Sequence, residues 1–196
     1  MDSNRLALAI GKRITLSPSE SEYLISMFKP RSIRAGRYLL MDGDVCKYLS
    51  FVVKGCLKTF YLDDHATEHI LDFLVEDWWA DDLYSFLTQS ASKYHIKAIE
   101  DTELLQITKN NLEILYDKIP KIERYFRILF QNAYISQREQ INLNLSASAE
   151  KRYKLFVGQK PYAEKRFTQK DIASYLGVTP QFFSLMKRKL KNQGKA

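Results

Sequence analysis

Two kinds of hydrophobic pattern divide this chain near residue 109. Between Arg31 and Ile107, apolar and polar residues alternate in short stretches that are separated by turn residues such as Gly43 and Gly55. From Lys109 onward, the apolar residues recur at the spacing of helix turns. Alternation with a period of two predicts half-buried strands, and a series of short strands predicts a small antiparallel barrel or jelly roll. The chain is therefore predicted to be an α+β protein, in which an antiparallel, jelly-roll-like β-roll precedes the helices.

The strands of the β-roll are predicted from five stretches, which span residues 31–44, 47–64, 67–79, 94–100 and 102–107. A helix is expected before them, over residues 17–28. Its start signal is a serine that can cap the helix, Ser17, followed by Pro18 in the first helical position and Glu20 three residues after the serine.

Residues 121–145 contain no Gly or Pro and are predicted to form one long central helix, after a short helix that ends before Pro120. Apolar residues occur on more than one face of the long helix, so more than one face is expected to be buried. One face can pack on the β-roll, and another can meet a second copy of the chain in a two-fold dimer. The alternative is an ordinary central helix of a monomer. The predicted dimer residues form one stripe and are Ile122, Phe126, Leu129 and Ala133.

A helix-turn-helix pattern occupies residues 167–190, after a further helix that is expected to end near Gly158. Thr168 can cap the first helix of the pair, and Thr179 can cap the second. Gly177 suits the bend between them, because glycine adopts a positive φ at little cost. The small and apolar residues that would pack the two helices together are Ile172, Ala173, Leu176, Val178, Phe183 and Met186. This order of residues is typical of a DNA-reading helix pair.

The second helix of the pair is expected to enter the major groove of DNA with its N-terminal turn. Gln181 can pair with adenine through two hydrogen bonds, and Arg188 can pair with guanine in the same way. Residues expected to hold phosphates, which fix position without reading sequence, are Thr168, Lys170, Thr179 and Lys187. The remaining predicted DNA-binding residues are Gln169, Pro180 and Ser184. The alternative for each lysine is a solvated surface charge.

The positive charge of the chain is concentrated in this same region. The chain has a formal net charge of +7, and the segment from Ala149 to Ala196 contains 12 Lys and Arg against 3 Asp and Glu, a net charge of +9. The rest of the chain therefore has 30 − 12 = 18 basic and 23 − 3 = 20 acidic residues, a net charge of −2. A basic segment beside a nearly neutral one favours a polyanion partner such as double-stranded DNA.

Other classes of protein have little support in the sequence. No apolar run reaches the roughly 20 residues that cross a membrane, and no signal peptide is recognised, so a cytoplasmic location is expected. The two cysteines, Cys46 and Cys56, are too few for a four-cysteine metal or iron–sulfur site. Neither a phosphate-binding glycine loop nor a nucleophile elbow is found, so we predict no enzyme activity, no metal and no cofactor.

The order of these parts resembles the Crp–Fnr superfamily of bacterial transcription regulators, which combine a cyclic-nucleotide-binding-like β-roll with a C-terminal winged helix-turn-helix. The resemblance covers nearly the whole chain and is best at residues 47–64, around Gly55, and at residues 167–190. It implies a sensor domain over residues 1–118, a central dimerisation helix over residues 119–146 and a DNA-binding domain over residues 147–196. It also implies a homodimer that binds near-palindromic promoter DNA, contacts RNA polymerase and responds to an effector in the β-roll.

The chain departs from this family at two places that bear on function. Where members that bind cyclic nucleotides carry Gly-Glu and Arg-Ser or Arg-Thr, this chain has Ala80-Asp81 and Ser92-Lys93. Because lysine offers a point charge rather than a fork and alanine lacks the backbone freedom of glycine, a cyclic nucleotide is not expected. The effector is left open, and the residues that could still form its pocket are Trp79, Asp81, Asp82, Ser92 and Lys93.

The second departure lies in the reading helix, where Leu185 replaces an arginine that is common in the family. A different base preference is therefore expected. Only residues 191–196 follow the basic part of this helix, so a wing that is short or absent is also expected. The alternative function is a small-molecule sensor that acts through protein contacts, in which the helix-turn-helix does not read DNA. The lysines in residues 187–195 argue against this alternative, since packing alone does not require them.

Overall fold

The computed structural model describes residue 2 and residues 4–193. Its contacts divide the chain into two compact units. The first unit contains the residues up to 62 and residues 71–131, and the second contains residues 63–70 and the residues from 132 onward. The boundary lies inside the long helix α5 (Lys121–Ser146).

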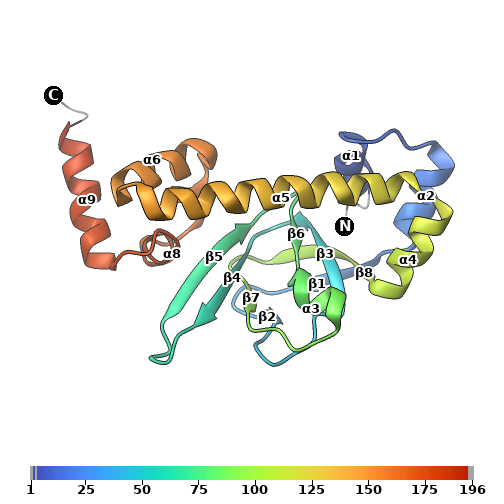
Figure 1. Cartoon of the computed structure of the whole chain (residues 1–196), viewed down its shortest axis with the longest axis horizontal. Coiled ribbons are helices and arrows are strands. Elements are labelled where there is room, and N and C mark those ends of the chain that lie inside the picture. Colours follow the sequence, from blue (N-terminus) through green and yellow to red (C-terminus); the bar gives the residue numbers. More distant parts are fainter. Residues whose placement is uncertain (1, 3, 194–196) are drawn as a thin grey trace. The chain divides into compact units, whose positions relative to one another are not determined.

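Two four-stranded antiparallel sheets form the β-roll (Figure 1). One sheet has the strand order β1-β8-β3-β6, and the other has the order β2-β7-β4-β5. The strands are β1 (Lys29–Ile33), β2 (Tyr38–Leu40), β3 (Tyr48–Lys54), β4 (Leu57–Leu62), β5 (Glu68–Leu74), β6 (Trp79–Ala80), β7 (His95–Ala98) and β8 (Thr102–Thr108). The predicted α+β class with an N-terminal antiparallel roll is confirmed.

The β3–β4 hairpin depends on one glycine. Gly55 has a φ of +96°, and a Cβ atom at this position would lie 2.6 Å from the carbonyl oxygen of Asp101. A side chain is therefore excluded both by the backbone conformation and by the neighbouring strand. Gly55 also donates its N–H to Oε1 of Glu76 at 2.8 Å, which fixes the turn to the chain after β5.

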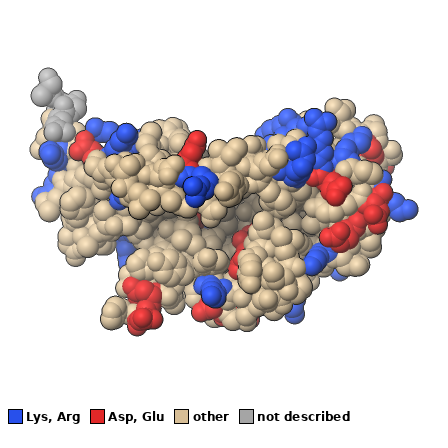
Figure 2. Space-filling view, in the orientation of Figure 1, with Lys and Arg blue, Asp and Glu red and all other residues tan. Residues whose placement is uncertain are grey.

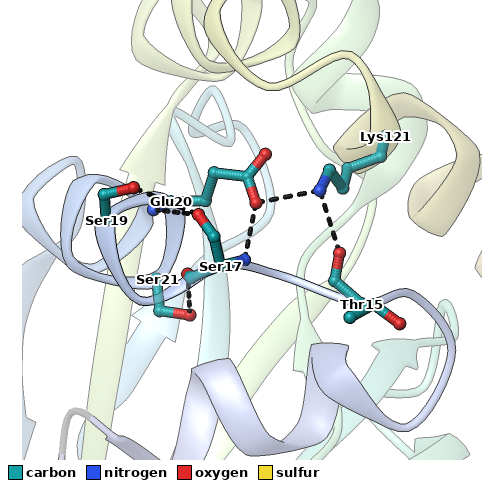
Figure 3. Close-up of polar contacts among 6 residues, drawn as sticks. All are labelled: Thr15, Ser17, Ser19, Glu20, Ser21 and Lys121. Carbon is teal, nitrogen blue, oxygen red and sulfur yellow. Dashed lines mark hydrogen bonds and ion pairs between the residues drawn. The ribbon is translucent and has the colours of Figure 1, made fainter.

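Helices α1 (Asn4–Gly11), α2 (Pro18–Ser26), α3 (Leu83–Thr88) and α4 (Lys109–Lys118) belong to the first unit. The predicted start of α2 is confirmed, because the Ser17 hydroxyl accepts from the N–H of Glu20 while Glu20 accepts from the N–H of Ser17 (Figure 3). Lys121, the first residue of α5, donates from Nζ to Glu20 at 2.8 Å and to the Thr15 carbonyl at 3.0 Å. This contact fixes the start of α5 to α2. Helices α1 and α3 had not been predicted.

The first turns of α5 are part of the core of the first unit. Ile122 and Phe126 are 0% and 2% exposed, and the ring of Phe126 packs against Trp79 with 5.2 Å between the ring centres. Leu129 packs on the same core, whereas Ala133 is exposed. The predicted dimer stripe therefore begins with two side chains that are already buried in the core of the first unit, and these two cannot offer their surface to a second copy.

The second unit is built mainly from helices: the rest of α5, α6 (Ala149–Gln159), α7 (Ala163–Arg166), α8 (Gln169–Tyr175) and α9 (Pro180–Gln193). Its core contains the buried side chains Tyr153, Phe156, Ala163, Phe167, Ile172, Ala173, Leu176, Phe183 and Met186. The prediction of a short or absent wing concerns residues 194–196, which lie outside the described residues. Among all the described residues, no helix is both long enough and apolar enough to cross a membrane.

Candidate nucleic-acid interface

Both helices of the predicted pair begin at a capping threonine. The Thr168 hydroxyl accepts from the N–H of Asp171 at 3.1 Å and donates to its carboxylate at 2.7 Å, at the start of α8. The Thr179 hydroxyl accepts from the N–H of Phe182 at 3.2 Å, at the start of α9. Between them, Gly177 has a φ of +65°, as predicted for the bend. Local hydrogen bonds therefore fix where each helix starts.

The buried face of α9 sets which of its residues point outward. Phe183 is fully buried and packs edge-on against the ring of Tyr153, with 5.3 Å between the ring centres. Met186 is 8% exposed, so it lies on the same buried side one turn later. Gln181 and Arg188, which were predicted to read bases, are both exposed. The rotation of α9 about its axis thus presents both candidate reading residues to solvent.

Most of the predicted DNA-binding residues share this exposure. The exposed ones are Thr168, Gln169, Lys170, Thr179, Pro180, Gln181, Ser184 and Arg188. Lys187 differs, because it is half-buried and its ammonium pairs with the Glu164 carboxylate on α7. Hydrogen bonds from Lys187 and from the Tyr153 hydroxyl lower the pKa of Glu164. Lys187 therefore joins α9 to α7 in this structure, rather than extending freely toward a phosphate.

Two features of this interface were not among the predicted site residues. Phe182 and Leu185 are large apolar side chains that are 51% and 58% exposed on α9. Arg152 on α6 donates to backbone carbonyl groups at the ends of α5 and α8. The helical spacing from Phe183 and Met186 already indicates from the sequence that the first pair faces outward. Nothing in the local sequence around Arg152 indicates its distant partners.

The exposed basic residues of α6 and α9 add positive charge to the second unit. Lys151, Lys189 and Lys191 are exposed, and Lys154 forms an ion pair with Glu150 at 2.8 Å. Figure 2 shows Lys and Arg side chains where these helices lie in Figure 1. Cations of this kind bind the phosphates of a nucleic acid and release its counterions.

A second candidate region lies in the β-roll, where the predicted effector residues occur. Asp82 caps α3, since Oδ1 accepts from the N–H of Ser85 at 3.2 Å and Oδ2 accepts from the Ser92 hydroxyl at 2.8 Å. All three residues are buried. The Ser85 hydroxyl in turn accepts from the N–H of Cys46 at 2.9 Å. In this network the Asp82 carboxylate and the hydroxyl groups of Ser85 and Ser92 all have hydrogen-bond partners. The Ser92 hydroxyl donates its proton to a carboxylate.

The five predicted effector residues are not brought into one pocket. Trp79 is in the aromatic core, where its indole N–H donates to the Tyr125 hydroxyl at 3.1 Å, and Lys93 is exposed. Asp81 lies beside Asp82, and burial followed by the charge of Asp82 raises the pKa of Asp81 to about 7. A cyclic phosphate placed here would meet a buried carboxylate and no arginine. The residues present therefore do not fit a cyclic nucleotide.

A metal or an iron–sulfur cluster also lacks suitable ligands in the described residues. No group of three or more His, Cys, Asp or Glu side chains is placed there to hold a metal ion. Cys46 and Cys56 are both buried, and burial raises the pKa of the Cys46 thiol to about 11. Metal ligation requires the thiolate form, which this environment disfavours.

The first unit carries a basic surface of its own. A hollow of about 530 Å³ is lined by Gly11, Lys12, Arg13, Ile14, Thr15, Lys121 and Arg124. Figure 2 shows a group of Lys and Arg side chains over the region of α1 and the start of α5. Lys12 pairs with Asp77 at 3.2 Å and Lys121 pairs with Glu20 at 2.8 Å, so part of this positive charge is balanced.

Comparisons with known proteins agree with this arrangement of parts. Residues 30–118 match the family described as "Cyclic nucleotide-binding domain". The chain is 25% identical over 194 residues to Electron transport regulator A of Shewanella oneidensis, covering 92% of this chain and 76% of that protein. It is 26% identical over 184 residues to the Fumarate and nitrate reduction regulatory protein of Vibrio cholerae, covering 87% of this chain and 72% of that protein.

Two solved structures are similar in fold. FixK2 from Bradyrhizobium japonicum matches with a TM-score of 0.73 at 18% identity, covering 85% of this chain and 86% of that chain. The c-di-GMP responsive global regulator CLP of Xanthomonas campestris matches with a TM-score of 0.75 at 13% identity, covering 91% and 93%. Identities this low establish a shared fold, which here extends over both the β-roll and the helices that follow.

Proposed function

Because this chain is a divergent member of the Crp–Fnr superfamily of transcription regulators, we propose that it is a homodimeric DNA-binding regulator that reads a near-palindromic promoter site with α9. The observation that carries the proposal is the outward face of α9. Gln181 and Arg188 are exposed on it, while Phe183 and Met186 anchor the opposite side. A helix anchored in this way can place its first turns in the major groove.

The caps of the helix pair support the same reading. Thr168 and Thr179 are exposed at the N-termini of α8 and α9, and the positive end of α9 favours a phosphate. At α8, the Thr168 hydroxyl donates to Asp171, so a phosphate contact of Thr168 requires that hydroxyl to turn away from the carboxylate. Lys170 and Gln169 are exposed in the first turn of α8. We assign these four residues to phosphate contacts, which would hold α9 in register while its side chains meet the bases.

The dimer contact is assigned to the exposed apolar residues of α5. Tyr134, Ile141 and Leu145 are 64%, 43% and 84% exposed. Their spacings of seven and four residues place them on one side of the helix, within a sector of about 40°. A second copy related by a two-fold axis would cover this side. Ile122 and Phe126 are excluded from this contact because the core of the first unit already covers them.

The proposal includes no cyclic nucleotide, because Asp82 and Ser92 are bonded to each other where a cyclic phosphate would bind. A cytoplasmic location is part of the proposal, since the DNA of a bacterial cell lies there.

The function is tested by the dependence of DNA binding on salt and on Arg188. Fluorescence anisotropy with a duplex recovered by selection should give an affinity that falls steeply as salt rises. Arg188→Ala should weaken binding to that duplex by about tenfold or more, as expected for loss of one base contact. The control is Lys47→Ala, which removes an exposed charge from the first unit and should leave binding unchanged. A flat salt dependence together with an inert Arg188→Ala change would refute the proposal.

A further inference from the structure

The outward face of α9 carries two apolar side chains that no packing role explains. Leu185 is 58% exposed and Phe182 is 51% exposed, although α9 has an apolar core side on which Phe183 and Met186 are buried. Among the described residues, no aromatic ring stacks on Phe182, whereas Phe183 packs against Tyr153. The two exposed side chains are therefore available to a partner of the reading helix.

Helix geometry places Leu185 beside the two candidate reading residues, between them and Phe182 around the helix. With about 100° between successive residues, Leu185 lies about 40° from Gln181 and about 60° from Arg188. Phe182 lies about 60° from Leu185 on the other side, one turn nearer the start of the helix. Along the helix axis, Leu185 lies between Gln181 and Arg188, so it neighbours the bases that these two residues would contact.

Leu185 can recognise only one feature of the major groove. Its side chain has no donor or acceptor, so a polar base edge packed against it would lose its hydrogen bonds to water without replacement. The C5 methyl group of thymine is the apolar group that base pairs present in the major groove. A leucine held against that methyl group removes apolar surface of both partners from water.

We propose that Leu185, supported by Phe182, is a specificity-determining residue that reads the methyl group of a thymine in each half-site. This inference rests on the proposed function, since it requires α9 to lie in the major groove. With Gln181 directed at an adenine, it predicts that adjacent A·T pairs mark the part of the half-site under the first turns of α9.

Deoxyuridine provides the test, because it differs from thymidine only in the missing methyl group. Each thymine of a selected half-site is replaced in turn by deoxyuridine, and the affinity of the full-length protein is measured by anisotropy. We expect one or two positions at which wild-type protein loses about threefold to fivefold in affinity, the value of one buried methyl group. At those positions, Leu185→Ala should bind the thymidine and deoxyuridine duplexes equally, as a double-mutant cycle requires.

The matched control is Leu155→Ala, which truncates a leucine on α6 that is 38% exposed. This variant should lose as much affinity as wild-type protein does when the thymidine is replaced by deoxyuridine. If wild-type protein binds its selected site specifically but no thymine is sensitive, or if Leu185→Ala keeps the sensitivity, this inference fails while the proposed function stands. If selection recovers no specific site at all, both fail together.

Discussion

Arg152 on α6 donates a hydrogen bond of 2.8 Å from Nη2 to the carbonyl oxygen of Leu176, the C-cap residue that follows α8. Its Nη1 atom donates to the carbonyl oxygens of Asn144 and Ala147, at 3.1 Å and 3.3 Å, where α5 ends. One guanidinium thus satisfies acceptors at the C-terminal ends of two helices, where the helix dipoles favour a cation. The turn of the helix pair is joined in this way to the end of α5.

Arg152→Gln should therefore destabilise the second unit. The shorter neutral side chain cannot reach three carbonyl groups, and a hydrogen bond of a folded protein contributes about 0.5–1.5 kcal/mol to its stability. The measurement is the free energy of unfolding from urea titration. Lys151→Gln is the control, because Lys151 is an exposed neighbour on the same helix. Equal stabilities of the two variants would contradict the role given to Arg152.

Asp81 should make stability depend on pH between about 4 and 7. Burial and the neighbouring Asp82 raise the pKa of Asp81 from 3.8 to about 7 in the folded protein. The folded state therefore binds a proton more tightly than the unfolded state, so the stabilising contribution is present below about pH 4 and is lost as the pH rises toward 7. We expect a slope that approaches about 1.4 kcal/mol per pH unit in this range.

Urea titrations of wild-type protein and of Asp81→Asn at pH 5 and pH 8 measure this effect. The asparagine variant cannot ionise, so its stability should exceed that of wild-type protein by more at pH 8 than at pH 5. A difference between the two proteins that is the same at both pH values would show that Asp81 is not protonated in the folded state.

Cyclic nucleotides should not stabilise the protein. The Ser92 hydroxyl is donated to the Asp82 carboxylate, and that carboxylate repels an added phosphate. Cyclic AMP and cyclic GMP at millimolar concentration should leave the melting temperature unchanged, since only a ligand that binds the folded state raises it. A saturable rise in melting temperature with either nucleotide, lost in Asp82→Ala, would overturn this reading of the β-roll.

The exposed apolar side of α5 should control the oligomeric state. Replacing both Ile141 and Leu145 with arginine places charge on the proposed contact, so the double variant should be a monomer at concentrations at which wild-type protein is a dimer. Ser136→Arg is the control, because Ser136 is exposed on another side of the same helix. Sedimentation equilibrium gives the masses. A dimeric double variant would locate the contact elsewhere.

Local signals in the sequence predicted much of the second unit. The caps at Thr168 and Thr179 and the bend at Gly177 depend on neighbours within four residues, so each could be read from the pattern alone. The capping box of α2 is local in the same sense. Features of this kind involve only residues that are close in sequence, so the local pattern is sufficient to predict them.

Features that depend on contacts between residues far apart in the sequence were predicted only in part or not at all. The spacing of Ile122 and Phe126 shows that their face of the helix is buried, but helical spacing does not say whether the β-roll or a second copy covers it. Helix α3 begins where Asp82 accepts hydrogen bonds from Ser85 and from Ser92, and the second of these lies across a loop. Arg152 meets Leu176 only after the helices have packed.

The most direct test of the account is selection of bound duplexes from a random DNA pool by the purified full-length protein, without added ligand. A two-fold palindrome with half-site centres about 10–11 base pairs apart is the predicted result, since two copies of α9 would enter successive major grooves on one side of the duplex. Binding that is sensitive to salt but indifferent to sequence, with no palindrome recovered, would contradict the claim that α9 reads DNA.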